Sequence, residues 1–209
     1  MTAALTRPTS IVSIREYLDR EHASEEKHEY WWGEVIAMTG GTFDHSRVAT
    51  NIVCALYARL RHTPHLPHGN YLRVRINRTG RYVYPDATVV CGQPEFDPDD
   101  PRKTTILNPS VVVEVLSESS ETRDLTAKLQ AYTELRSVRE YLVIDSRRRH
   151  AIAYTRDAAD RWLVTLRHQP DDTLPIASLR IDLPLSAIYA GVDVPPIDAP
   201  PGATPPPTL

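Results

Sequence analysis

Two hydrophobic periods run along the chain, and each predicts one kind of secondary structure. Apolar residues three or four positions apart line one side of a helix, whereas apolar residues at every second position line one face of a strand. The helical spacing recurs in four stretches, with strand-like stretches between them. The expected helices are IREYLDREHA after Ser13, the segment from Thr42 to about Leu60, the segment from Glu121 to about Leu135, and LPLSAIYAGV around Pro184.

Polar side chains at the starts of the first two helices support these boundaries. Ser13 can cap the first helix, and Glu16, three residues later, would complete a capping box. Thr42 or Asp44 can cap the second helix, whose apolar stripe begins at Val48.

The strand-like stretches are of exposed and buried kinds. EYWWGEVIAM predicts two extended pieces around Gly33, as a hairpin or a bent strand. YLRVRI places Arg73 and Arg75 on one face, which we expect to be solvated. YVYPDATVVC contains Pro85, which lacks a backbone donor, so this strand is expected at an edge, bulged or locally unpaired. The buried stretches are SVVVEVL and REYLVID, and an antiparallel hairpin is expected from RRHAIAYTRD and RWLVTLRH.

Together these elements predict an α/β fold in which a mixed β-sheet is flanked by helices. A chain of 209 residues with 41% hydrophobic residues can bury one sizeable core, so we expect a single domain over residues 1–192. Residues 193–209 are rich in proline and predict a disordered or extended tail. The polar stretch GQPEFDPDDPRKTTILNP is long enough to predict a functional loop.

Charge and cysteine content narrow the possible functions. The formal net charge of −3 excludes a protein that coats nucleic acid through a general positive excess, so any such contact must come from local patches. Cys54 and Cys91 fit no metal-binding spacing, and we expect small core residues in a reducing compartment. The sequence has neither a secretory signal nor an apolar run of membrane length, so we expect a cytoplasmic protein.

One carboxylate lies where a buried strand should hold no charge. Glu114 is surrounded by valines and a leucine in SVVVEVL, and burial of an unpaired carboxylate is costly. Asp86 follows Pro85 in the preceding strand, and if the two strands are neighbours the two acids can converge. Such a pair suits Mg²⁺, which binds one or two protein carboxylates together with water and a substrate phosphate. Lys128 borders the apolar face of the next helix and can reach back toward both acids.

Each of these residues also has a simpler interpretation. Glu114 could pair with a buried arginine, because buried charges are usually paired. Asp86 could be a turn or bulge residue that follows proline. Lys128 could pair with Asp124, four residues earlier, or extend along the surface to solvent.

Five blocks of sequence occur in a specific order between about residues 17 and 192. They are YWWGEVIAMTG, FDHSR, YVYPDATVVC, NPSVVVEVLSESSETRDLTAKLQAY and REYLVID. In this order they resemble the Uma-two (Uma2) family of restriction-type endonucleases, which is placed in the PD-(D/E)XK nuclease superfamily. The resemblance implies a restriction-endonuclease-like mixed β-sheet flanked by helices, with an additional antiparallel hairpin, and a divalent-metal site.

The resemblance also assigns roles to individual residues. Asp86 and Glu114 would be metal ligands, and the backbone carbonyl of Val115 could reach the same ion. The lysine that usually stands two residues after the second acid is absent, because that position holds Leu116. Lys128, in the following helix, matches the family lysine instead.

Three further positions match residues of the family. Glu34 would hold a second metal or a metal-bound water, and Tyr132 lies near the lysine. His45 would contact phosphate or relay a proton, although taken alone it is typical of a surface histidine. The chain departs from the family at one place: members often read D-R-G-x-K, whereas the same interval from Asp124 to Lys128 reads D-L-T-A-K here.

The leading hypothesis is a DNA endonuclease that depends on Mg²⁺ or Mn²⁺ and acts as a homodimer, with one active site for each strand. Asp86 and Glu114 would bind the metal, Lys128 would position or activate the attacking water, and Glu34 and His45 would assist. A hypothesis from another class is a non-catalytic nucleic-acid-binding or assembly protein that retains the nuclease fold, which the acidic net charge favours. Hydrolysis of a different phosphoester is a third possibility.

Overall fold

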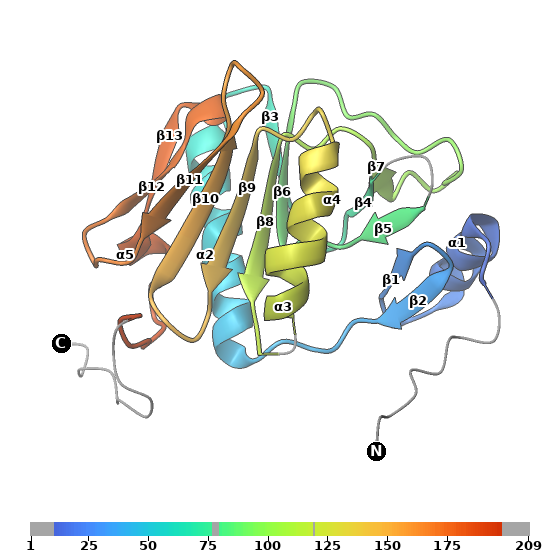
Figure 1. Ribbon diagram of the computed structural model, residues 1–209, viewed down its shortest axis with the longest axis horizontal. Helices are drawn as coiled ribbons and strands as arrows, with labels where there is room; N and C mark the ends of the chain where they lie inside the picture. Colours follow the sequence, from blue (N-terminus) through green and yellow to red (C-terminus); the bar gives the residue numbers. More distant parts are fainter. Residues whose placement is uncertain (1–10, 77–79, 119, 198–209) are drawn as a thin grey trace.

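A mixed six-stranded sheet forms the centre of the molecule, with helices on both faces (Figure 1). The computed structural model describes residues 11–76, 80–118 and 120–197. In the sheet order β11-β10-β9-β8-β6-β3, only β8 and β9 are parallel. The strands are β3 (His65–Gly69), β6 (Ala87–Cys91), β8 (Val111–Leu116), β9 (Glu140–Asp145), β10 (His150–Arg156) and β11 (Trp162–Arg167). The predicted mixed sheet and the β10–β11 hairpin are therefore confirmed.

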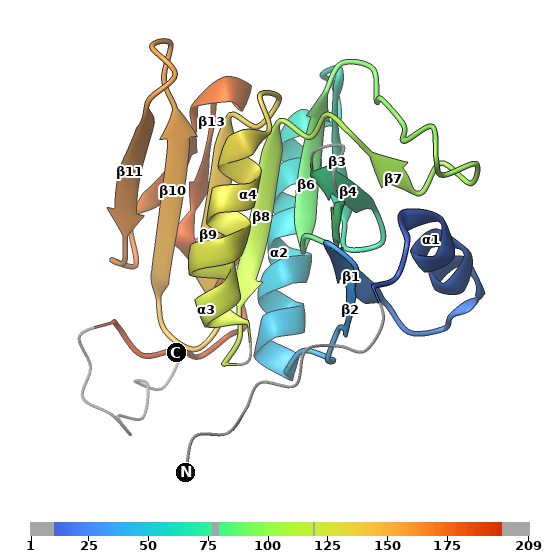
Figure 2. The ribbon, with the colours of Figure 1, turned by 45° about the vertical axis from the view of Figure 1, so that its right-hand side comes forward.

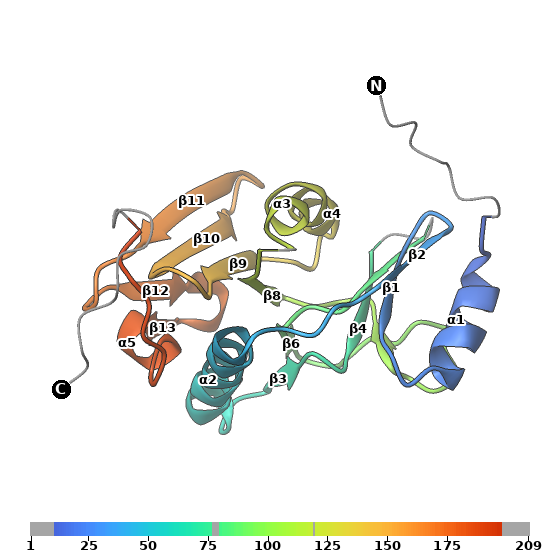
Figure 3. The same ribbon diagram turned by 90° about the horizontal axis from the view of Figure 1, so that it is seen from below.

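The two faces of this sheet bury different partners (Figure 3). One face packs on the long helix α2 (Phe43–Leu60), on α5 (Leu185–Ile188), and on the hairpin of β12 (Thr173–Ile176) and β13 (Ile181–Pro184). The other face packs on a helical segment made of α3 (Glu121–Arg123), a π-helical turn η1 (Asp124–Lys128) and α4 (Leu129–Glu134). A short 3₁₀ turn, η2 (Ala177–Leu179), joins β12 to β13.

Alternation along β8 decides which way its carboxylate points. Val113 and Val115 belong to the core on the α2 side, and Val112 and Leu116 belong to the core on the α4 side. Because successive side chains of a strand point to opposite faces, Glu114 faces the helical segment that carries Lys128.

A second, five-stranded sheet lies beside the first, with the order β2-β1-β5-β4-β7 (Figure 2). Its strands are β1 (His28–Trp31), β2 (Glu34–Ala37), β4 (Arg73–Ile76), β5 (Arg81–Val83) and β7 (Thr105–Ile106). Helix α1 (Ile14–Ala23) packs its Tyr17 and Leu18 against Tyr30 and Tyr82 of this sheet. The predicted hairpin at Gly33 is confirmed, since that glycine has a φ of 99° in the turn between β1 and β2.

The chain crosses from one sheet to the other at Pro85. β5 belongs to the five-stranded sheet and β6 to the six-stranded sheet, and Pro85 lies between them outside both strands. The expectation that the chain is locally unpaired at this proline is confirmed. Asp86 is therefore held at the junction of the two sheets, immediately before β6.

The prediction that Arg73 and Arg75 form a solvated face is wrong. Arg73 is 1% exposed, and its Nη2 lies 3.1 Å from Oδ2 of Asp100. Nη1 of Arg75 contacts Asp97 at 2.5 Å and Asp99 at 2.8 Å. All three acids come from the long polar stretch between β6 and β7, so the described contacts of that stretch anchor it to β4.

Asp100 is the most strongly bound of these acids. Burial raises the pKa of its carboxyl, but hydrogen bonds from Thr104 and Thr105 and the charge of Arg73 outweigh burial and lower it from 3.8 to about 2. The carboxylate therefore stays ionised and keeps the Arg73 guanidinium paired inside the protein.

Other expectations are modified by the structure. The helix expected from Glu121 to Leu135 is interrupted by the π-helical turn, which sequence periodicity did not indicate. The prediction of a core cysteine is wrong for Cys54, which is exposed, whereas Cys91 is half-buried and packs against the core. Most of the proline-rich tail, residues 198–209, lies outside the described residues, as does part of the turn after β4. Within the described ranges, the model has no helix with the length and apolar character needed to cross a membrane.

Candidate functional site

Asp86 and Glu114 meet at the junction of the two sheets. β6 and β8 are antiparallel with Ala87 opposite Val113, so the same register continued by one residue sets Asp86 opposite Glu114. The backbone N–H of Val115 donates a hydrogen bond of 2.7 Å to Oδ2 of Asp86. Both acids line one pocket of about 220 Å³, which we call the acid pocket. The expected convergence of the two carboxylates is therefore present in the structure.

Lys128 lies inside this pocket and is surrounded by three carboxylates. Its Nζ is 2.9 Å from Oε1 of Glu29, 3.0 Å from Oε1 of Glu114 and 3.3 Å from Oδ1 of Asp124. The lysine side chain is 6% exposed, and the three carboxylates are equally well buried. Lys128 therefore contacts Asp124 on its own helix and Glu114 on the sheet, as two of the interpretations expected. The third, a lysine that extends along the surface to solvent, is wrong, because the side chain is buried.

The helical segment over β8 presents a second donor to Glu114. The Tyr132 hydroxyl, four residues after Lys128 at the end of the π-helical turn, donates to Oε1 of Glu114 at 2.9 Å. The Tyr141 hydroxyl holds the start of this turn by donating 2.9 Å to the Asp124 carbonyl. Lys128 and Tyr132 both use Oε1, so neither contact involves Oε2 of Glu114.

Burial and charge act against each other in this cluster. Burial raises the pKa of Glu114 well above its ordinary range; Lys128 opposes the rise, and Asp124, Asp86 and Glu29 add to it. Burial also raises the pKa of Asp124. Burial lowers the pKa of Lys128, but the carboxylates outweigh it and hold the ammonium charged. Three carboxylates around one ammonium would leave an excess of negative charge if all were ionised, and such an arrangement favours binding of a proton or a metal cation.

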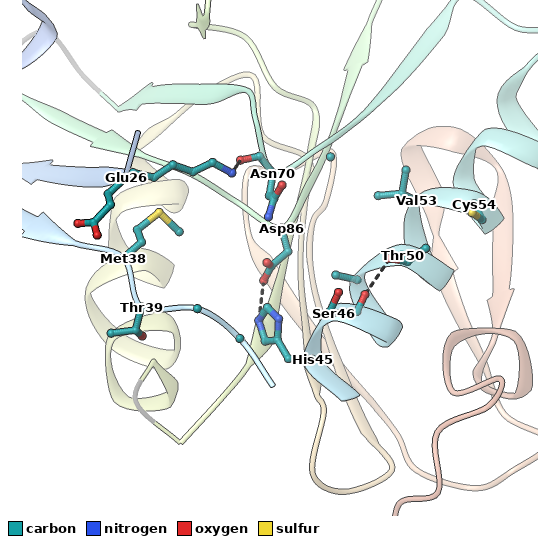
Figure 4. A pocket seen from close by; sticks show the side chains of 15 residues that line it. Glu26, Met38, Thr39, His45, Ser46, Thr50, Val53, Cys54, Asn70 and Asp86 are labelled. Carbon is teal, nitrogen blue, oxygen red and sulfur yellow. Dashed lines mark hydrogen bonds and ion pairs between the residues drawn. The ribbon is translucent and has the colours of Figure 1, made fainter. Parts of the chain in front are cut away.

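His45, at the start of α2, points toward the carboxylate of Asp86 (Figure 4). Thr42 caps α2 by accepting from the His45 N–H at 3.2 Å, and this places the imidazole in the first turn with Nε2 3.5 Å from Oδ2 of Asp86. Its pKa is raised, first by the hydrogen bond to Asp86 and less by one to the Val115 backbone. A side chain at Gly41 would displace this ring, because a Cβ there would lie 2.6 Å from Nδ1.

The acid pocket contains Glu29, which the sequence analysis missed, and does not contain Glu34, which it predicted. Glu34 is exposed at the start of β2 and is not among the residues lining the acid pocket. Glu29, on β1, is 2% exposed and accepts a hydrogen bond of 3.1 Å from Nε1 of Trp31. The signal available in the sequence was weak: an acid two residues before a tryptophan, in a strand that buries three of its four residues.

The alternative interpretation of Glu114, a pair with a buried arginine, does not hold within the described part of the chain. Its ion-pair partner is Lys128 rather than an arginine. The nearest guanidinium contact in the cluster is Arg123, whose Nη1 lies 3.8 Å from Oε2 of Glu29 and whose side chain is 44% exposed.

The acid pocket offers two carboxylates to a divalent ion, which would need further ligands from the backbone or from water. Among the described residues, no group of three or more His, Cys, Asp and Glu side chains is arranged to hold a metal. The negative excess and the half-buried Asp86 beside Glu114 suit a hard cation that takes its other ligands from carbonyl oxygens and water. The donor set therefore fits Mg²⁺ or Mn²⁺ better than a metal that needs a full side-chain cage.

Comparison with known proteins agrees with this fold. A crystal structure described as a "putative nuclease" from Anabaena variabilis superposes with a TM-score of 0.63 and 16% identity, covering 84% of this chain and 98% of that one. This likeness supports the fold. An uncharacterised protein of Synechocystis sp. is 32% identical over 88% of this chain and 95% of its own length. A second one from the same organism is 31% identical over 75% of this chain and 88% of its own length.

The family model of Uma2, described as "Putative restriction endonuclease", matches residues 14–187 and so includes every residue of the acid pocket. On this match, together with the two relatives, the chain belongs to the Uma2 family.

Proposed function

We propose that this protein is a DNA endonuclease that hydrolyses phosphodiester bonds with a divalent metal, Mg²⁺ or Mn²⁺, in the acid pocket. The observation that carries the proposal is the cluster of three buried carboxylates around Lys128, beside the half-buried Asp86. A cluster with this negative excess is costly in a protein that only needs to fold. Family membership supports a nuclease rather than another hydrolase.

Asp86, Glu114 and the Val115 carbonyl would hold the ion. When bound, the ion would activate water and neutralise charge that develops on the phosphate. Oε2 of Glu114 suits this role, because Lys128 and Tyr132 both occupy Oε1 and thereby fix the orientation of the carboxylate.

The side chains around the ion would orient the reacting groups. Lys128 is positioned to direct its ammonium toward an attacking water or a phosphate oxygen, since it stays charged in a dry environment. Glu29 and Asp124 keep that ammonium in place. His45, with its raised pKa, can donate a proton or a hydrogen bond to a phosphate near Asp86. We assign the supporting acid to Glu29 rather than to Glu34, because Glu29 contacts Lys128.

Metal binding and cleavage test the proposal together. Calorimetry with Mn²⁺ should give binding for the wild type, weaker binding for Asp86→Asn and Glu114→Gln, and unchanged binding for Asp182→Asn. Asp182 is an exposed acid on β13, and circular dichroism would show that each variant is folded. No binding of Mn²⁺ by the wild type at millimolar concentration would contradict the proposal.

Cleavage of plasmid and single-stranded DNA would then be compared among the same proteins. Lys128→Met should lower kcat by about 100- to 1000-fold if the ammonium stabilises developing charge. Glu29→Gln should lower the rate and Glu34→Gln should not, which decides which acid supports the site. Equal cleavage by wild type and Glu114→Gln would point to a contaminating nuclease and would leave a non-catalytic binding protein as the function.

A further inference from the structure

Three neighbouring hollows form a continuous path across the protein surface. The acid pocket shares Asp86 and His45 with a larger hollow of about 760 Å³, which we call the central groove. The central groove in turn shares Gly69 and Asn70 with an outer hollow of about 340 Å³. A polymer that enters the acid pocket therefore has a way out along the β3–β4 turn.

Most of the residues that line the central groove are uncharged, and two acids, Glu26 and Asp86, are among the rest (Figure 4). This lining suits a base more than a row of phosphates. Val53 from α2 and Met38 after β2 contribute apolar surface, and Thr50 and Asn70 contribute hydroxyl and amide groups. Among the described residues that line it, Lys27 is the only lysine or arginine. A wide duplex interface normally relies on many such cations, so this groove is poorly suited to a duplex backbone.

An aromatic ring stands where the central groove passes into the outer hollow. Tyr71, in the β3–β4 turn, is 82% exposed and lines the outer hollow together with Lys103. Nζ of Lys27 lies 3.7 Å from the centre of the Tyr71 ring and also donates a hydrogen bond of 3.0 Å to the Asn70 carbonyl. Lys27 thus lies over the ring, and Lys103 lines the same hollow. An exposed aromatic ring with positive charge nearby for the backbone is the combination that single-stranded nucleic acids bind.

We propose that the central groove and outer hollow bind one single strand of nucleic acid, with a base stacked on Tyr71 and the adjoining phosphates beside Lys27 and Lys103. The proposal rests on the endonuclease function for the bond that is cut, and it adds the class of substrate. A base must be unpaired to stack on a side chain, so the recognised segment is a single strand, a flap or a bubble. The acidic net charge of −3 agrees with a narrow contact that uses stacking.

Binding can be measured without cleavage in the Glu114→Gln background. Fluorescence anisotropy of a labelled single-stranded oligonucleotide should show Tyr71→Ala to bind about 5- to 150-fold more weakly, the range expected for one lost base stack. Tyr71→Phe keeps the ring and should bind normally. Tyr57→Ala is the matched control, because Tyr57 is 63% exposed on α2 and lines none of the three hollows. Lys103→Gln should reduce the slope of log K against log salt by about 0.7.

Two results of this experiment would overturn the proposal. One is equal affinity of Tyr71→Ala and the parent protein for the single strand. The other is tighter binding of a matched duplex, with the same loss in Tyr71→Ala, which would assign the surface to double-stranded DNA.

Cleavage kinetics separate this proposal from the endonuclease function. Tyr71→Ala should raise KM for the oligonucleotide and leave turnover of bis(p-nitrophenyl) phosphate unchanged, because that small diester cannot reach from the acid pocket to Tyr71. If Glu114→Gln abolishes cleavage while Tyr71→Ala leaves KM unchanged, the groove proposal alone fails. If the wild type cleaves nothing but Tyr71→Ala loses binding, the endonuclease function alone fails.

Discussion

Replacing Lys128 with methionine tests whether the acid cluster depends on one ammonium. Methionine keeps most of the side-chain volume but leaves Glu29, Glu114 and Asp124 as buried acids, all of which contact Nζ within 3.3 Å in the structure. Breaking a buried ion pair by removing one partner costs about 3–5 kcal/mol, and we expect a loss of that size in the free energy of unfolding at pH 8.

The loss should shrink at lower pH. In the variant, the pKa of Glu114 in the folded protein lies further above its ordinary value of 4.5, because burial and the other acids raise it and Lys128 no longer opposes them. A raised pKa contributes stability that is present below pH 4.5 and disappears as the pH rises through the folded value. The difference from wild type is therefore smaller at pH 5 than at pH 8.

Urea denaturation followed by tryptophan fluorescence, at both pH values and with and without Mg²⁺, measures these effects. Arg123→Met is the matched control; Arg123 is 44% exposed and 3.8 Å from Glu29, so its removal should cost less than about 1 kcal/mol. Mg²⁺ should stabilise Lys128→Met more than wild type, because the ion replaces lost positive charge. Equal stabilities of Lys128→Met and wild type at pH 8 would refute the reasoning.

Three further predictions concern other parts of the molecule. The pKa of Asp100 is lowered from 3.8 to about 2, so this carboxylate should add about 2 kcal/mol to the free energy of unfolding above pH 4, and the contribution should be lost as the pH falls toward 2. In urea titrations, Asp100→Asn should remove this acid dependence. A pH profile unchanged by the substitution would contradict the prediction. Tyr132→Phe removes a donor to the buried Glu114 and should cost about 1–3 kcal/mol by the same assay, whereas no change would mean the hydroxyl is dispensable. The expected homodimer predicts twice the chain mass in light scattering, and a monomer at every concentration would exclude it.

The local layout could be predicted because it depends on neighbours in the sequence. Helical and strand periods located α1, α2 and most of the strands, and Thr42 was available as a cap before any coordinates were known. The approach of Asp86 to Glu114 could also be inferred, since successive strands often pair and a buried carboxylate needs a partner. The π-helical turn could not, because one extra residue in a turn leaves little trace in a short hydrophobic pattern.

The wrong expectations share a physical cause. Arginines that alternate with apolar residues in a strand predict a solvent-exposed face. Arg73 is buried instead, because Asp100, which is 27 residues away in the sequence, pairs with it. Glu29 looked like an ordinary strand residue because its contact with Lys128 joins positions 99 residues apart in the chain.

The sequence by itself determined the elements, their order, and the need for positive charge near a carboxylate set among valines. The tertiary structure alone decided that one ammonium, that of Lys128, contacts Glu114, Asp124 and the unpredicted Glu29 at once. It also decided that the His45 imidazole contacts Asp86. The reason is that the strength of an ion pair depends on distance and on exclusion of water, and both are set only when segments remote in the sequence are packed together.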